Sequence, residues 1–159
     1  MKKPQLYLET STWNFYYADD APEKKEATLQ FFEKVALGAY DIYFSEIVLQ
    51  EFARSRPEKA QQLVNLVEKY EPNELDASVD AVELAKRYIR DGVIPEKKFE
   101  DAMHAAIATV NQMDALVSWN LEHLANFNKM ERINAVNMSE GYTKLLVLIT
   151  PMEVANAGS

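Results

Sequence analysis

The sequence lacks cysteine, has only four glycines and six prolines in 159 residues, and contains no long apolar run. Without cysteine there can be no disulfide, zinc–thiolate site, iron–sulfur cluster or thiol nucleophile. The longest apolar run, residues 145–149, is far shorter than the roughly 20 residues that span a bilayer. The N-terminal segment reaches Glu9 after a short apolar stretch and has no signal-peptide core. We therefore expect a cytoplasmic protein with no membrane partner.

Positive charge is also scarce, because 17 Lys and Arg stand against 25 Asp and Glu, which gives a formal charge of −8. The field around such a protein repels phosphate at long range, which excludes a generic nucleic-acid coat. It does not exclude action on nucleic acid where basic residues gather beside one acidic site. The hydrophobic content of 48% and charged content of 26% are those of an ordinary globular domain.

Strand and helix patterns alternate along the chain. Strands are predicted at 5–9, 41–44, 73–76, 115–118 and 133–136, and helices at 23–38, 45–55, 57–70, 78–90, from 95 onward and after 139. This alternation predicts an α/β fold with a mostly parallel central sheet of about five strands and helices on both faces. We expect a single domain over residues 1–154 and a flexible C-terminal tail at 155–159.

Four residues with oxygen side chains occupy special positions. Glu9 ends the first strand and Asn120 follows the strand at 115–118, and sites form at the carboxyl ends of such strands. Glu51 and Asp101 lie on the predicted inward faces of their helices, where a bare carboxylate is costly unless it is paired or binds a metal. Each carboxylate alone is more simply a salt-bridge partner or a helix-dipole contact. Together they suit Mg²⁺ or Mn²⁺, which prefer hard oxygen ligands.

Four further residues have more than one interpretation. Ser11 could bind a phosphate or cap a helix, and His123 could contact phosphate, orient Asn120 or simply cap a turn. Arg54 could hold a phosphate backbone or belong to a solvated face, and the same holds for Arg56 and for Lys97 and Lys98, which precede Asp101. For His104, three residues after Asp101, a local Asp–His pair is favoured over metal ligation.

At these residues the sequence resembles a PIN domain, the nuclease fold of VapC-type toxins. The resemblance is carried by Tyr7–Thr12, Val48–Arg54, Asp101–Ala108, Leu116–Asn120 and Leu148–Val154. The overlapping segment Ser118–His123, Ser-Trp-Asn-Leu-Glu-His, is similar to the signature of one subgroup. The chain departs from the usual pattern twice, because Glu9 and Asn120 stand where aspartate is usual.

The resemblance implies a PIN-like three-layer α/β/α sandwich and a divalent-metal-dependent ribonuclease. Glu9, Glu51 and Asp101 would hold Mg²⁺ or Mn²⁺, with Asn120 as a neutral fourth ligand or a water-orienting group, and Ser11, Arg54 and His123 would bind substrate. RNA as substrate, a homodimer and a small antitoxin partner are implied in the same way. The alternative is a PIN-fold module that has lost its chemistry and binds metal, RNA or a protein partner without cleavage.

Overall fold

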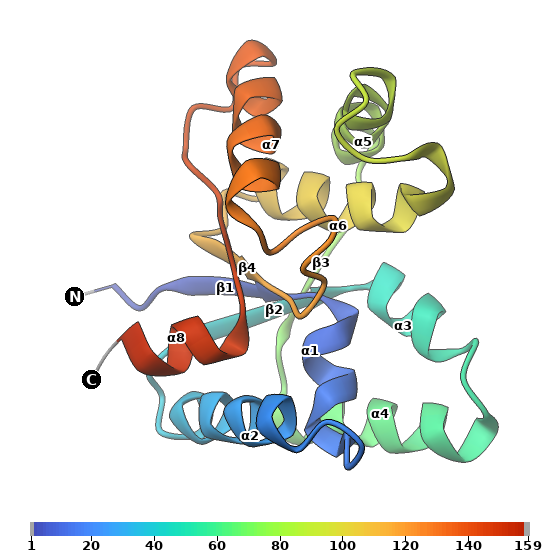
Figure 1. Ribbon diagram of the computed structural model, residues 1–159, viewed down its shortest axis with the longest axis vertical. Helices are drawn as coiled ribbons and strands as arrows, with labels where there is room; N and C mark the ends of the chain where they lie inside the picture. Colours follow the sequence, from blue (N-terminus) through green and yellow to red (C-terminus); the bar gives the residue numbers. More distant parts are fainter. Residues whose placement is uncertain (1, 158–159) are drawn as a thin grey trace.

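The computed structural model describes residues 2–157 and is built on a five-stranded parallel sheet (Figure 1). The strands are β1 (Gln5–Leu8), β2 (Asp41–Ser45), β3 (Asn73–Leu75), β4 (Ala115–Val117) and β5 (Val147–Ile149). Their order across the sheet is β3-β2-β1-β4-β5, so β1 lies at the centre and pairs with both β2 and β4. Because all pairings are parallel, the carboxyl ends of β1, β2 and β4 meet at one edge of the sheet.

Helices cover both faces of the sheet and complete a three-layer α/β/α sandwich, as predicted (Figure 1). One face carries α5 (Val79–Arg90), α6 (Phe99–Val110) and α7 (Phe127–Ser139). The other carries α1 (Thr10–Asn14), α2 (Pro22–Ala36), α4 (Pro57–Tyr70) and α8 (Pro151–Ala157). Helix α3 (Glu46–Phe52) contributes to both cores, and short 3₁₀ turns lie at η1 (Phe15–Tyr17) and η2 (Glu96–Lys98).

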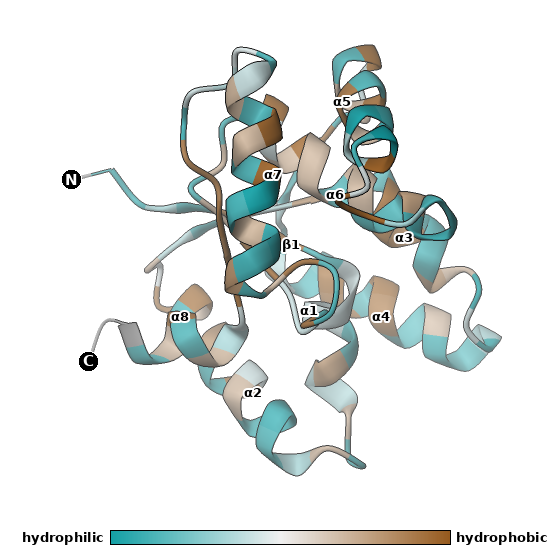
Figure 2. Cartoon of the chain, turned by 45° about the horizontal axis from the view of Figure 1, so that its top comes forward, coloured by the Kyte–Doolittle hydropathy of each residue, from teal (hydrophilic) through white to brown (hydrophobic). Residues whose placement is uncertain are grey.

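The two cores follow from the alternation of side chains along β1. Leu6 and Leu8 enter the core under α2 and α4, whereas Tyr7 points into the opposite core against α6. The buried alanines of α6 let this helix lie close to the sheet. In Figure 2 the ribbons of α5 and α7 change between hydrophilic and hydrophobic colours within each turn, as expected for helices with one buried face.

The last strand is not where the sequence pattern placed it. Residues 133–136 belong to α7, where Ile133 and Val136 lie on one buried helical face, and the fifth strand is β5. Asn134 of α7 donates to the carbonyl of Leu146 and accepts from its N–H, which ties the helix to the start of β5. The predicted helix after residue 139 was therefore wrong in its main part, and the apolar run at 145–149 was the strand signal.

The boundaries at the C-terminus also differ from the prediction of a flexible tail at 155–159. Residues 155–157 are part of α8, and Ala155 is buried, because the helix begins at Pro151 and packs on α2. Residues 158 and 159 lie outside the described residues. Within residues 2–157, the helices are all too short or too polar to cross a membrane.

Candidate active site and metal-binding residues

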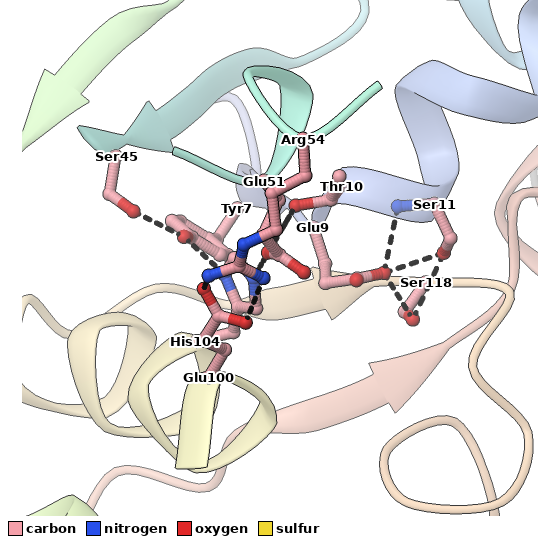
Figure 3. Close-up of polar contacts among 10 residues, drawn as sticks. All are labelled: Tyr7, Glu9, Thr10, Ser11, Ser45, Glu51, Arg54, Glu100, His104 and Ser118. Carbon is pink, nitrogen blue, oxygen red and sulfur yellow. Dashed lines mark hydrogen bonds and ion pairs between the residues drawn. The ribbon is translucent and has the colours of Figure 1, made fainter. Parts of the chain in front are cut away.

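Polar side chains from four elements meet at the carboxyl end of the central strands. Glu9 follows β1 directly, Glu51 comes from α3, and His104 comes from α6 (Figure 3). Ser118 follows β4, the neighbour of β1, and therefore lies beside Glu9. The parallel sheet thus brings together residues that are more than 100 positions apart in the sequence.

Glu9 is held by hydroxyl groups. Its backbone is extended and caps α1, and its Oε1 atom accepts from the N–H of Ser11 at 3.1 Å. The same oxygen accepts from Ser11 Oγ at 2.5 Å and from Ser118 Oγ at 2.7 Å. Ser11 Oγ in turn accepts from the N–H of Trp119 at 2.8 Å. Ser11 lies inside α1, whose N-cap is Glu9, so its hydroxyl caps no helix in this structure and instead holds the Glu9 carboxylate.

Glu51 and His104 form an ion pair across α3 and α6. His104 Nε2 lies 2.5 Å from Glu51 Oε1, and the hydroxyl of Thr10 donates to the same carboxylate oxygen at 2.6 Å. His104 is fully buried, whereas the Glu51 side chain keeps 20% of its surface exposed. The predicted Asp101–His104 pair is replaced by this longer-range contact.

A second buried contact fixes the other nitrogen of the imidazole. Tyr7 Oη lies 2.7 Å from His104 Nδ1 and 2.7 Å from Ser45 Oγ. Ser45 stands at the N-cap position of α3, but its hydroxyl bonds Tyr7 and makes no cap hydrogen bond. A local capping preference has therefore given way to a tertiary contact that orients His104.

Burial and charge perturb every ionisable group of this cluster. Burial raises the pKa of Glu9, against the opposing effects of His104 and the serine hydroxyls. Burial alone would raise the pKa of Glu51, but the hydrogen bond and charge of His104, with Thr10 and Arg54, outweigh it and lower the value. Burial would lower the pKa of His104, and the hydrogen bond to Glu51 and the nearby carboxylates raise it instead. Both shifts favour the charged forms of the pair, a Glu51 carboxylate beside a His104 imidazolium.

The geometry of this cluster fits a metal ion. Glu9, Glu51 and His104 each offer a ligand atom, and these atoms all lie within 4.8 Å of one another. The set provides two carboxylates and one nitrogen that is oriented by a hydrogen bond on its other side, which is the usual arrangement of a ligating histidine. A divalent cation could take over the charge compensation that the imidazolium proton supplies.

Asp101 and Asn120 lie at the side of this group. Burial raises the pKa of Asp101, while the charge of His104, a hydrogen bond from Asn120 and the charge of His123 oppose it. Asn120 Oδ1 accepts from the N–H of His123 at 3.0 Å, so the amide nitrogen is the atom left to face Asp101. His123 is buried, and its Nδ1 has no hydrogen-bond partner among the described residues.

Arg54 is not free to meet a ligand in this structure. Its guanidinium donates to both carboxylate oxygens of Glu100, at 2.6 and 2.5 Å, and thereby links the turn after α3 to the start of α6 (Figure 3).

The structure thus gathers the predicted residues at one edge of the sheet and adds others that the sequence analysis did not assign to the site. His104, Thr10, Tyr7 and Ser118 are the additions. The available signal for His104 was its place on the same buried face of α6 as Asp101, Ala105 and Ala108. No comparable signal marks Tyr7, which looks like an ordinary core residue of β1.

No protein-family model matches this sequence, and no curated protein matches it either. Solved structures do match. One match is the structure of VapBC2 from Rickettsia felis bound to a DNA fragment from the VapBC2 promoter. It aligns with a TM-score of 0.56 and 19% identity over 92% of this chain and 98% of that chain. DNA-bound VapBC from Salmonella typhimurium aligns with a TM-score of 0.55 and 18% identity over 93% of this chain and 98% of that chain.

A third match is VapC20 from Mycobacterium tuberculosis, described as a sarcin–ricin loop cleaving toxin. It aligns with a TM-score of 0.53 and 14% identity over 74% of this chain and 92% of that chain. At these identities the likeness is one of fold. The chain therefore has a PIN-like fold of the VapC type.

Proposed function

We propose that this protein is a divalent-metal-dependent endoribonuclease of the VapC-like toxin kind. The observation that carries the proposal is the convergence of Glu9, Glu51 and His104, with Asp101 beside them, at the carboxyl end of a PIN-like sheet. VapC20, which shares this fold, is a sarcin–ricin loop cleaving toxin, and this supports RNA as the substrate. The VapBC structures support a small antitoxin as partner. A homodimer and action in the cytoplasm belong to the same proposal.

In this proposal Glu9, Glu51 and His104 hold Mg²⁺ or Mn²⁺, and Asp101 adds a third carboxylate beside them. The nitrogen of His104 makes the site better suited to Mn²⁺ than an all-oxygen set would be. Such a cation, when bound, activates water and offsets the charge that develops at phosphorus. Ser11 and Ser118 keep Glu9 in place, and Tyr7 keeps His104 in place.

The sequence suggested Asn120 as a neutral fourth metal ligand or a water-orienting group, but its contacts suit another role. Its Oδ1 is bonded to the N–H of His123, and its amide nitrogen faces Asp101. We therefore infer that Asn120 orients Asp101 rather than binding the metal through oxygen. His123, whose N–H donates to Asn120 and whose charge acts on Asp101, is the proposed contact with the substrate.

The competing function is a PIN-fold module that binds RNA or a partner without cleaving. It is favoured by the Glu51–His104 pair, which already neutralises part of the acidic cluster. Cleavage of single-stranded RNA in Mg²⁺ or Mn²⁺ separates the two functions. The deciding variant is Glu51→Gln, and its matched control is Glu46→Gln, an exposed glutamate on the same helix. We expect cleavage by wild type and by the control but not by Glu51→Gln, and equal background from all three would refute the nuclease.

A further inference from the structure

The ion pair between Arg54 and Glu100 connects the two helical segments that supply the site. Arg54 comes three residues after Glu51, and Glu100 directly precedes Asp101 on α6. The charge of Arg54 is near enough to help lower the pKa of Glu51. Figure 3 shows the pair beside the Glu51–His104 contact. Among the described residues, the ion pair with Glu100 is the hydrogen-bonded contact of the Arg54 side chain, and it lies next to the site residues Glu51 and Asp101.

The geometry of the pair is that of a phosphate clamp. Arg54 Nη1 donates to Glu100 Oε1 and Nη2 donates to Oε2. A planar fork of this kind can bind either a carboxylate or a phosphate group in the same bidentate way. The Arg54 side chain is 64% exposed and that of Glu100 is 31% exposed. An ion pair this open to water contributes little stability and can exchange its partner at small cost.

We propose that Glu100 stands in for a substrate phosphate on Arg54, and that RNA binds when a backbone phosphate replaces the Glu100 carboxylate in the same fork. This inference rests on the proposed function and names the group that receives the phosphate. In the free protein Glu100 keeps the guanidinium occupied, so that Arg54 does not pair with Glu51. In the complex the guanidinium of Arg54 would offset the charge of one RNA phosphate, which matters in a protein whose formal net charge of −8 repels RNA.

The test measures RNA binding separately from cleavage. A fluorescently labelled single-stranded RNA is titrated with protein in EDTA, and anisotropy gives Kd for wild type, Glu100→Gln, Arg54→Gln and the double variant. Glu96→Gln, which removes the same charge at an exposed position four residues away in η2, is the matched control. Thermal melts establish that each variant is folded.

We expect Glu100→Gln to bind RNA about two- to fivefold tighter, because the competitor for Arg54 is gone. Arg54→Gln should bind more weakly, and the slope of log Kd against log salt should fall by about 0.7, the value for one phosphate contact on a single strand. On the Arg54→Gln background the Glu100 change should have no further effect. Glu96→Gln should change Kd by less than about twofold, because a solvated charge is screened.

Each other outcome overturns the inference in a recognisable way. If RNA binds but Glu100→Gln leaves Kd unchanged, or Glu96→Gln tightens it equally, the exchange is wrong and the proposed nuclease stands. If Glu100→Gln tightens binding but no form cleaves RNA with metal, the exchange stands and the nuclease fails. If no form binds RNA in EDTA, the exchange is wrong, and cleavage with Mg²⁺ or Mn²⁺ decides the nuclease separately.

Discussion

Tyr7 and His104 share a fully buried hydrogen bond of 2.7 Å between Oη and Nδ1. Burial raises the pKa of Tyr7 well above its usual value, so the tyrosine stays neutral and retains its proton. A consistent network then has His104 Nδ1–H donating to Tyr7, and the Tyr7 hydroxyl donating to Ser45. The other nitrogen, Nε2, is then directed at Glu51. Tyr7, in the middle of the central strand β1, thus determines that His104 presents Nε2 to the site.

Removing that hydroxyl should destabilise the protein. Tyr7→Phe leaves His104 Nδ1–H and Ser45 without their buried partner, and an unsatisfied buried polar group costs about 1–3 kcal/mol. Urea unfolding gives the change in the free energy of unfolding. Tyr43→Phe on neighbouring β2 is the control, because its hydroxyl bonds the partly buried Gln5 side chain, and we expect a smaller loss there. Equal losses for the two variants would show that the Tyr7 contact has no special role.

A divalent metal should stabilise the folded protein through Glu9, Glu51 and His104. A ligand at 100 times its Kd adds about 2.7 kcal/mol. We expect Mn²⁺ to raise Tm more than Mg²⁺ does, because the site includes a nitrogen ligand. His104→Gln should remove most of the difference between the two metals, and Glu46→Gln should not. A Tm of wild type that is insensitive to millimolar Mn²⁺ would contradict the metal site.

The sequence pattern was sufficient for features that depend on local order. Glu9 at a strand end and Asp101 on an alanine-rich face were recognised because burial, periodicity and strand ends can be read from neighbouring residues. The fold class followed from the same alternation. The fifth strand was misplaced because Ile133 and Val136 suit a strand as well as a helical face, and periodicity alone cannot separate the two over four residues.

Contacts between segments that are far apart in the sequence could not be predicted from the sequence pattern. The partner of His104 is 53 residues away, and that of Arg54 is 46 residues away. Nothing in the local spacing distinguishes Glu51 from Asp101 as the partner of His104, and the nearer residue was preferred for that reason. The crossing of α3 and α6 decides the pairing, and this depends on how the whole core packs.

Acid stability should depend on Asp114, which ties the start of β1 to the loop before β5. The hydrogen bond from the N–H of Gln5, at 2.7 Å, and the ion pair with Lys144 lower the pKa of Asp114. Because the folded pKa lies below the unfolded value of about 3.9, this carboxylate stabilises the fold above about pH 4 and loses that effect as pH falls through the folded pKa.

Asp114→Asn should therefore lower Tm at pH 7 and reduce the further drop between pH 4 and 2. The control is Asp20→Asn, an exposed aspartate in a turn, which should shift neither part of the curve. Thermal melts across pH give both quantities. If wild type and Asp114→Asn lose Tm in parallel below pH 4, the carboxylate does not contribute to the acid transition.

Asn120→Asp tests the proposed orientation of the Asn120 side chain. The new carboxylate can still accept from the N–H of His123, but its second oxygen replaces an amide donor that now faces Asp101. Two carboxylates that face each other repel, so we expect the metal-free variant to lose about 1–2 kcal/mol, the equivalent of a pKa shift of about one unit. Saturating Mn²⁺ should recover this loss, because a carboxylate attracts the cation more strongly than an amide does.

Cleavage by the same variant then distinguishes two roles for residue 120. If the wild-type site is merely under-charged, Asn120→Asp should cleave RNA in Mn²⁺ as well as wild type or better. If the amide of Asn120 is needed to orient Asp101, Asn120→Asp should bind Mn²⁺ more tightly than wild type and cleave RNA more slowly. Asn120→Ala should then bind Mn²⁺ no more tightly than wild type and should also cleave more slowly. Unchanged stability of metal-free Asn120→Asp would mean that Asn120 does not face Asp101, and the inferred orienting role would then be wrong.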